Sequence, residues 1–287
     1  MGITILDGGM GQELLARSGA TPTPLWATRV MLDRPKLVRE IHDDYFAAGA
    51  TVATTNTYGL HRDRLAPHGL EEQLADLHRI ACEMAVASRD AVGSGQVAGA
   101  LGPLGWSYTT DAPPAHAAEL FAEICDIQAP FVDLFLIETA SSLAQARAAV
   151  DGARGHGKPV WLAVSVMDED GTRLRSGEPV ADVLDQLDGV DALFINCSTP
   201  EAVGDGLKHI ASAPAPLGAY ANGFTKINSS FVQAGATVQA LRPREDLGPE
   251  AYADFAADWV RTGATIIGGC CEVGPAHIAE LTRRFAA

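Results

Sequence analysis

The segment Asp133-Leu-Phe-Leu-Ile-Glu-Thr139 places four consecutive apolar residues ahead of a carboxylate and a hydroxyl side chain. Such a run is typical of a strand in a parallel sheet, because both faces of that strand are buried. The segment Ala192-Leu-Phe-Ile-Asn-Cys-Ser198 repeats the pattern and ends in polar side chains that include Cys197. Both segments predict buried strands whose carboxyl ends carry chemically useful groups.

Similar apolar runs alternate with segments of helical periodicity along all 287 residues. The strand candidates are 3–9, 51–57, 96–104, 133–139, 159–166, 192–198, 217–223 and 264–271. The helix candidates are 35–48, 71–92, 115–129, 141–154, 179–187, 200–211, 249–262 and 274–285. This alternation predicts an α/β fold in which residues 1–287 form a single (β/α)8 TIM barrel. A doubly wound open sheet is the alternative.

Composition restricts the class of protein. Hydrophobic residues make up 47% of the chain and charged residues 20%, which favours a large core over disorder. No apolar stretch is long enough to span a bilayer, and the N-terminal residues lack the features of a signal peptide, so we expect a cytoplasmic protein. The net charge of −15 argues against nucleic acid or an anionic membrane as a partner.

Polar residues gather at the predicted carboxyl ends of the strands, and in a barrel these ends meet at one mouth. Cys197 and the pair Cys270–Cys271 would therefore share a rim. Three thiolates form a soft ligand set that favours Zn²⁺, and a catalytic zinc site keeps one position open. Such a site suits activation of a substrate thiol that attacks an electrophilic carbon. The alternative is that each cysteine is a small buried apolar residue, which we prefer for Cys82 and Cys125 on helix candidates.

Two carboxylates end predicted strands, Asp7 and Glu138. They could act as an acid and base pair, bind a substrate ammonium group, or cap neighbouring segments. Other side chains could shape the pocket, or could simply pack: Asn56, Tyr58, Tyr220 and Asn222, with Trp26 as a cover or as a face for a methylated cation. The long connections 17–33 and 224–248 are where a barrel would build its site.

Several motifs together resemble one family. They are Leu6-Asp7-Gly8-Gly9-Met10-Gly11, Pro24-Leu25-Trp26, residues 42–50, Thr55-Asn56-Thr57-Tyr58, Gly102-Pro103, Glu138-Thr139, Asn196-Cys197-Ser198, and Gly268-Gly269-Cys270-Cys271 with residues 274–278. The chain resembles the homocysteine S-methyltransferases almost from end to end. The last motif, paired with Asn196-Cys197, is the most specific.

The resemblance implies a zinc barrel that transfers a methyl group to the thiolate of L-homocysteine and gives methionine. Cys197, Cys270 and Cys271 match the family's zinc ligands, and Asp7 and Glu138 match the carboxylates that hold the homocysteine amino group. Gly8, Gly9 and Thr55 match positions near the homocysteine pocket. The donor would be a sulfonium or quaternary ammonium compound, such as S-methylmethionine, S-adenosylmethionine or betaine.

Departures from the family pattern fall where the donor should sit, and they leave its identity open. They are Gln12, the short segment after Gly105, and Tyr220-Ala221-Asn222-Gly223-Phe224. Two alternatives therefore stand beside the main prediction. The chain could be the homocysteine-activating subunit of a split corrinoid-dependent methionine synthase, or a zinc- or thiol-binding barrel without turnover. We expect a monomer or small homo-oligomer.

Overall fold

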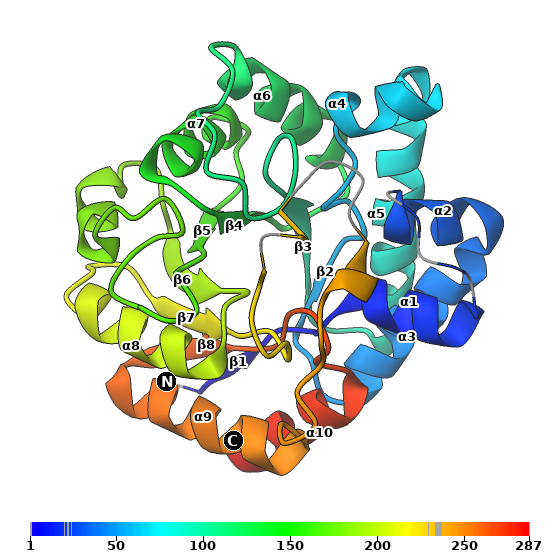
Figure 1. The fold of residues 1–287 in the computed structure, drawn as a ribbon. Coiled ribbons are helices and arrows are strands. Elements are labelled where there is room, and N and C mark those ends of the chain that lie inside the picture. Colours follow the sequence, from blue (N-terminus) through cyan, green and yellow to red (C-terminus); the bar gives the residue numbers. More distant parts are fainter. Residues whose placement is uncertain are drawn as a thin grey trace.

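The computed structural model describes residues 2–19, 21, 23, 25–228, 230–232 and 237–286, and for Trp26 the backbone alone. The strands are β1 (Thr4–Ile5), β2 (Val52–Thr54), β3 (Gln96–Leu101), β4 (Leu134–Ala140), β5 (Val160–Val164), β6 (Ala192–Asn196), β7 (Leu217–Tyr220) and β8 (Ala264–Ile267). Figure 1 shows them as a central ring surrounded by helices, which confirms the predicted (β/α)8 barrel.

All strand pairs are parallel, in the order β1-β8-β7-β6-β5-β4-β3-β2. A parallel bridge between Leu6 and Val52 joins β1 to β2 and completes the ring. The open-sheet alternative is therefore wrong. No helix of the described chain is both long and apolar enough to cross a membrane.

The α-helices are α1 (Met10–Ser18), α2 (Trp26–Asp33), α3 (Pro35–Ala47), α4 (Arg62–Leu65), α5 (Leu74–Val92), α6 (Ala117–Gln128), α7 (Leu143–Ala153), α8 (Pro200–Ile210), α9 (Pro249–Thr262) and α10 (Pro275–Phe285). Short 3-10 helices are η1 (Ala66–His68), η2 (Glu71–Gln73), η3 (Val180–Gln186) and η4 (Val238–Ala240). Proline opens several helices, where its missing N–H costs nothing. Ser142 caps α7 by accepting a hydrogen bond from the Gln145 N–H at 3.2 Å.

Two expectations about local structure need correction. The connection 17–33 is largely helical, because α1 extends to Ser18 and α2 covers Trp26–Asp33. The sequence does not predict α1, because the glycines near its start obscure the helical spacing of its apolar residues. The segment 179–187 forms the 3-10 helix η3 and not an α-helix. Its hydrogen bond from the Asp182 N–H to the Pro179 carbonyl spans three residues, as a 3-10 turn requires.

Alternate residues of the strands divide the core into two layers. Phe135 and Ile137 pack outward against the helices, whereas Leu134 and Leu136 belong to the interior of the barrel. The interior cluster consists of Leu6, Val52, Ala98, Leu134, Leu136, Ala163, Ala192, Phe194, Tyr220 and Ile266. The interior of the barrel is thus filled by side chains.

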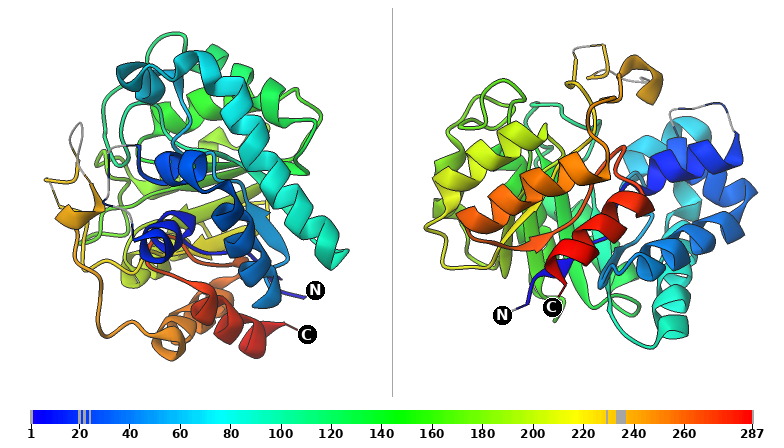
Figure 2. Two further views of the ribbon diagram at one scale, coloured as in Figure 1. Left: turned by 90° about the vertical axis from the view of Figure 1, so that its right-hand side faces the viewer. Right: turned by 90° about the horizontal axis from the view of Figure 1, so that it is seen from below.

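Figure 2 shows that the described parts of the segment after β7 project at one end of the barrel. The two chain ends lie near each other at the opposite end. Because the chain enters β1 at that opposite end, the projecting segment marks the carboxyl-terminal mouth.

Gly218 tests how tightly the interior is filled. A Cβ atom at this position would lie 2.0 Å from ring carbons of Phe194, so Gly218→Ala should lower the free energy of unfolding by about 1–3 kcal/mol. Gly204 lies inside α8, and in Gly204→Ala the new Cβ would lie 3.5 Å from Trp259. Because alanine favours a helix more than glycine does, the free energy of unfolding of this variant should rise by about 0.5–1 kcal/mol. Urea denaturation of both variants measures the difference, and equal stabilities would contradict this packing.

Candidate active site at the barrel mouth

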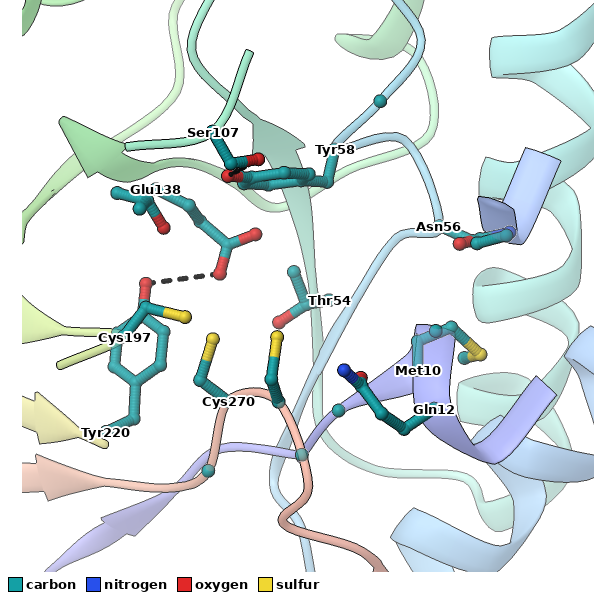
Figure 3. A pocket seen from close by; sticks show the side chains of 18 of the residues that line it. Met10, Gln12, Thr54, Asn56, Tyr58, Ser107, Glu138, Cys197, Tyr220 and Cys270 are labelled. Carbon is teal, nitrogen blue, oxygen red and sulfur yellow. Dashed lines mark hydrogen bonds between the residues drawn. The ribbon is translucent and has the colours of Figure 1, made fainter. Parts of the chain in front are cut away.

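The three predicted cysteines come together at the mouth. Cys197 directly follows β6, and Cys270 and Cys271 follow β8 after two glycines. Their sulfur atoms all lie within 4.8 Å of one another. Figure 3 shows the Cys197 and Cys270 side chains directed into the same space. Three ligand atoms in this arrangement could hold one metal ion.

Close backbone contacts set the position of the cysteine pair. The Gly9 N–H donates to the Val273 carbonyl at 2.9 Å, and the Gly269 N–H donates to the Asp7 carbonyl at 3.0 Å. A Cβ atom on Gly8 would lie 2.1 Å from the Val273 carbonyl oxygen, so only glycine allows this approach. The loop after β8 is therefore fixed against the end of β1.

Backbone strain is concentrated at the mouth. Within the described ranges, the non-glycine residues with positive φ are Tyr108, Thr139, Cys197 and Glu272. The first three line the cavity, and Glu272 follows Cys271. Conformations of this kind cost about 1–3 kcal/mol each and persist where the surrounding structure enforces them. Their clustering here points to a functional site.

Tyr108 contacts the cysteine cluster directly. Its hydroxyl lies 3.1 Å from Cys197 Sγ, and its ring packs under the guanidinium carbon of Arg175 at 4.6 Å. Arg175 is in turn paired with Asp168, whose side chain is buried, and donates to the Cys197 carbonyl at 3.3 Å. Tyr108 was not among the residues singled out in the sequence, because it lies in the irregular segment after Gly105.

Hydrogen bonding favours the ionised form of Cys197. Burial opposes its ionisation, but hydrogen bonds from the Cys270 and Cys271 thiols and from Tyr108 hold the pKa of Cys197 well below its usual range. The same hydrogen bonds raise the pKa values of Cys270 and Cys271, because their protons are shared with the Cys197 sulfur. These hydrogen bonds therefore favour ionisation of Cys197 over ionisation of Cys270 or Cys271.

Both predicted carboxylates line the same cavity. Burial raises the pKa of Asp7 to about 7, although the Thr54 N–H and hydroxyl donate to its two carboxylate oxygens at 2.6 and 2.8 Å. Burial, with the nearby negative charges of Cys197 and Asp7, raises the pKa of Glu138 to about 8. Glu138 accepts a hydrogen bond from the Tyr220 hydroxyl at 3.2 Å, drawn in Figure 3. A cation between these carboxyls would offset the cost of ionising them.

The remaining predicted residues have different positions. Gly8, Gly9, Thr55 and Asn56 line the cavity, as do Tyr58 and Tyr220. Asn222 is fully buried and is not part of the cavity lining; its side-chain oxygen accepts a hydrogen bond from the Phe224 N–H. Trp26 begins α2, and its side chain lies outside the described residues. The cavity volume of about 140 Å³ is close to that of an engineered cavity, about 150 Å³, that accepts benzene, so a small organic molecule has room here.

A barrel with a thiol cluster and two carboxyls in a cavity at its carboxyl-terminal mouth has the position and chemistry of an enzyme site. A sequence model of the family "Homocysteine S-methyltransferase" matches residues 4–285. The chain therefore belongs to the homocysteine S-methyltransferase family, and it is a methyltransferase of that class.

Individual relatives agree with this assignment. The homocysteine S-methyltransferase of Escherichia coli (strain K12) is 30% identical, over 98% of this chain and 95% of that protein. The homocysteine S-methyltransferase YbgG of Bacillus subtilis (strain 168) is 26% identical, over 97% and 93%. The metallated form of the homocysteine methyltransferase MmuM from Escherichia coli superimposes with a TM-score of 0.80 at 29% identity, over 99% of this chain and 96% of that chain.

Glu138→Gln tests the electrostatics of the mouth. Glutamate ionises near pH 4.5 in an unfolded chain but near pH 8 at this site, so the folded protein binds more protons between these values. The metal-free wild type should therefore lose stability relative to Glu138→Gln as the pH rises from about 5 to 9. Chemical denaturation at a series of pH values measures this difference. Glu119→Gln, on the exposed side of α6, should track the wild type, and a pH-independent effect of Glu138→Gln would refute the assignment.

Proposed function

We propose that this enzyme transfers a methyl group from a sulfonium or quaternary ammonium donor to the thiolate of L-homocysteine, giving methionine, with Zn²⁺ held by Cys197, Cys270 and Cys271. One observation carries the proposal. Three sulfur atoms within 4.8 Å of one another share a cavity with the carboxyls of buried Asp7 and half-buried Glu138. Homocysteine offers the complementary groups, a thiol and an ammonium.

The chemistry of the three cysteines supports zinc as the metal. Three thiolates suit a soft or borderline cation, and they leave one position of a tetrahedral site for an exogenous ligand. The lowered pKa of Cys197 favours metal binding, since ligands must lose their protons to bind. Zinc held there would lower the pKa of an incoming thiol and keep it nucleophilic at neutral pH.

Asp7 and Glu138 would orient the acceptor by binding its ammonium group. Asp7 is already fixed by Thr54, and Glu138 by Tyr220, so neither carboxyl must be ordered when the ligand enters. A bound ammonium would lower both raised pKa values and form charge-assisted hydrogen bonds. The amino-acid end of homocysteine would then be anchored while its sulfur points toward the cysteines.

Methyl transfer needs alignment more than acid–base catalysis. The acceptor sulfur forms a bond to the methyl carbon while the bond from that carbon to the donor sulfur or nitrogen breaks, and the leaving group departs neutral. No residue must protonate it. Holding both reactants in line in a narrow cavity supplies much of the rate.

Loss of one proposed ligand should abolish metal binding and turnover together. In Cys271→Ser we expect loss of bound zinc and a fall in kcat/KM of at least about 100-fold, because a free thiol is mostly protonated at neutral pH. Cys82→Ser is the matched control, since Cys82 is buried in α5 away from the site. Metal analysis and a methionine assay with a donor panel measure both effects. Full activity of zinc-free Cys271→Ser would exclude the proposal.

Asp7→Asn should weaken recognition of the acceptor ammonium. We expect KM for L-homocysteine to rise about 10- to 100-fold, the usual effect of losing a charged hydrogen-bond partner. KM for 4-mercaptobutyrate, which lacks the amino group, should change little. Equal losses for the two acceptors would show that Asp7 supports the structure of the site and does not bind the ammonium.

A second candidate concerns the source of the methyl group. The chain is 29% identical to the methionine synthase of Mycobacterium tuberculosis over 96% of its own length but only 25% of that protein. In this candidate a separate corrinoid protein would donate the methyl group. Rapid turnover with free S-methylmethionine, S-adenosylmethionine or betaine, in the absence of any partner, would exclude this candidate.

A further inference from the structure

Arg64 is a cation in the cavity wall that the proposed reaction has not used. It lies in α4, and among the described residues that line the cavity it is the only lysine or arginine. No carboxylate of the described chain forms an ion pair with it, although its neighbour Arg62 is paired with Glu123 at 2.9 Å. An arginine left without a carboxylate in a ligand cavity is free to bind an anion.

The contacts of Arg64 hold its guanidinium but do not neutralise it. One N–H donates to the Pro103 carbonyl at 2.9 Å, and the buried Nε atom has no acceptor. The guanidinium carbon lies 5.5 Å from the ring centre of Tyr58 and 6.0 Å from that of Trp106. Aromatic faces orient an arginine while leaving its planar set of donors available. Burial lowers the pKa of Arg64, yet an arginine stays charged, so this cation is kept at a cost in solvation.

The positions of charges in the cavity match an amino acid. Asp7 and Glu138 provide a region that suits an ammonium group, and Arg64 provides the opposite charge in the same cavity. Tyr58 connects the two regions, because it faces Arg64 and lies beside Glu138 and Ser107 in Figure 3. A planar guanidinium binds a carboxylate through two parallel hydrogen bonds, which fixes orientation as well as charge.

We propose that Arg64 forms a carboxylate-binding subsite that selects reactants carrying a carboxylate. This inference rests on the proposed function, since it concerns the reactants of that methyl transfer. The carboxylate can belong to the acceptor or to the donor, because both kinds of amino acid carry one. Neutral amides of the same compounds keep the size and shape but lose the charge that Arg64 recognises.

Calorimetry on the zinc-loaded protein tests the subsite without any need for turnover. The ligands are L-homocysteine and S-methylmethionine, each compared with its primary amide. In Arg64→Met, affinity for at least one of the two acids should fall about 10- to 100-fold while affinity for its amide stays within about twofold. Loss with homocysteine alone assigns the acceptor carboxylate, and loss with S-methylmethionine alone assigns the donor carboxylate.

Two further variants separate recognition from structural support. Arg64→Lys keeps the charge without the planar fork and should recover part of the lost affinity. Arg62→Met, whose charge lies outside the cavity, should bind all four ligands as the wild type does. Parallel losses for acids and amides in Arg64→Met, or unchanged affinities throughout, would overturn the subsite.

The same proteins distinguish this inference from the proposed function. Methionine formation is measured with homocysteine and S-methylmethionine, S-adenosylmethionine or betaine as donors. Selective binding of acids without methyl transfer from any donor would contradict the proposed function and leave the subsite standing. If methyl transfer occurs but wild type and Arg64→Met have the same KM for every acid and amide, the proposed function stands and the subsite is contradicted.

Discussion

The pairing of β1 with its two neighbours is the constraint on which the mouth depends. Leu6 pairs with Val52, and beyond it Asp7 donates from its N–H to the Val52 carbonyl while its own carbonyl accepts from Gly269. Asp7 thus lies on the seam where the ring closes. Its side chain is fixed by Thr54 of β2, and its main chain fixes the approach to the cysteine pair. The contacts that close the ring therefore also position Asp7 and the cysteine pair.

That constraint explains why the cavity tolerates groups that resist burial. Two carboxyls, three cysteines and an arginine line one cavity, and three of the lining residues have positive φ. Each group would be more stable in water, so the closed ring and filled interior must supply the free energy that keeps them in place. The reactants are expected to return part of that energy, since an ammonium group, a carboxylate and a metal each neutralise one of these charges.

The sequence predicts the barrel and the cysteine cluster for the same physical reason. Parallel strands carry long apolar runs, and their carboxyl ends meet at one rim, so Cys197 and the pair after β8 are brought together by topology alone. Tyr108 and Arg64 could not be found in this way, because both lie in connections without periodicity and depend on how loops fold over the mouth. Asn222 lies near the carboxyl end of the strand candidate 217–223, where a side chain is expected to reach the mouth. Its side chain instead accepts a hydrogen bond from the Phe224 N–H and does not line the cavity. Strand-end position indicates the rim, but it does not fix the direction of each side chain.

The spacing of the three sulfur atoms also has a chemical cost. Thiols that lie closely enough to share a metal are also close enough for an oxidant to join two of them as a disulfide. The lowered pKa of Cys197 favours that reaction, because the thiolate is the reactive form. A disulfide between two of these cysteines would remove two metal ligands at once. The enzyme would then be inactive until a reductant restores the two thiols. Cys82 and Cys125 are buried on separate helices and are not expected to oxidise in this way. Burial raises the pKa of Cys82 to about 12, which keeps it in the unreactive thiol form. A metal bound by the three cysteines would therefore protect them from oxidation in addition to its role in the reaction, and its loss would make the enzyme sensitive to oxygen.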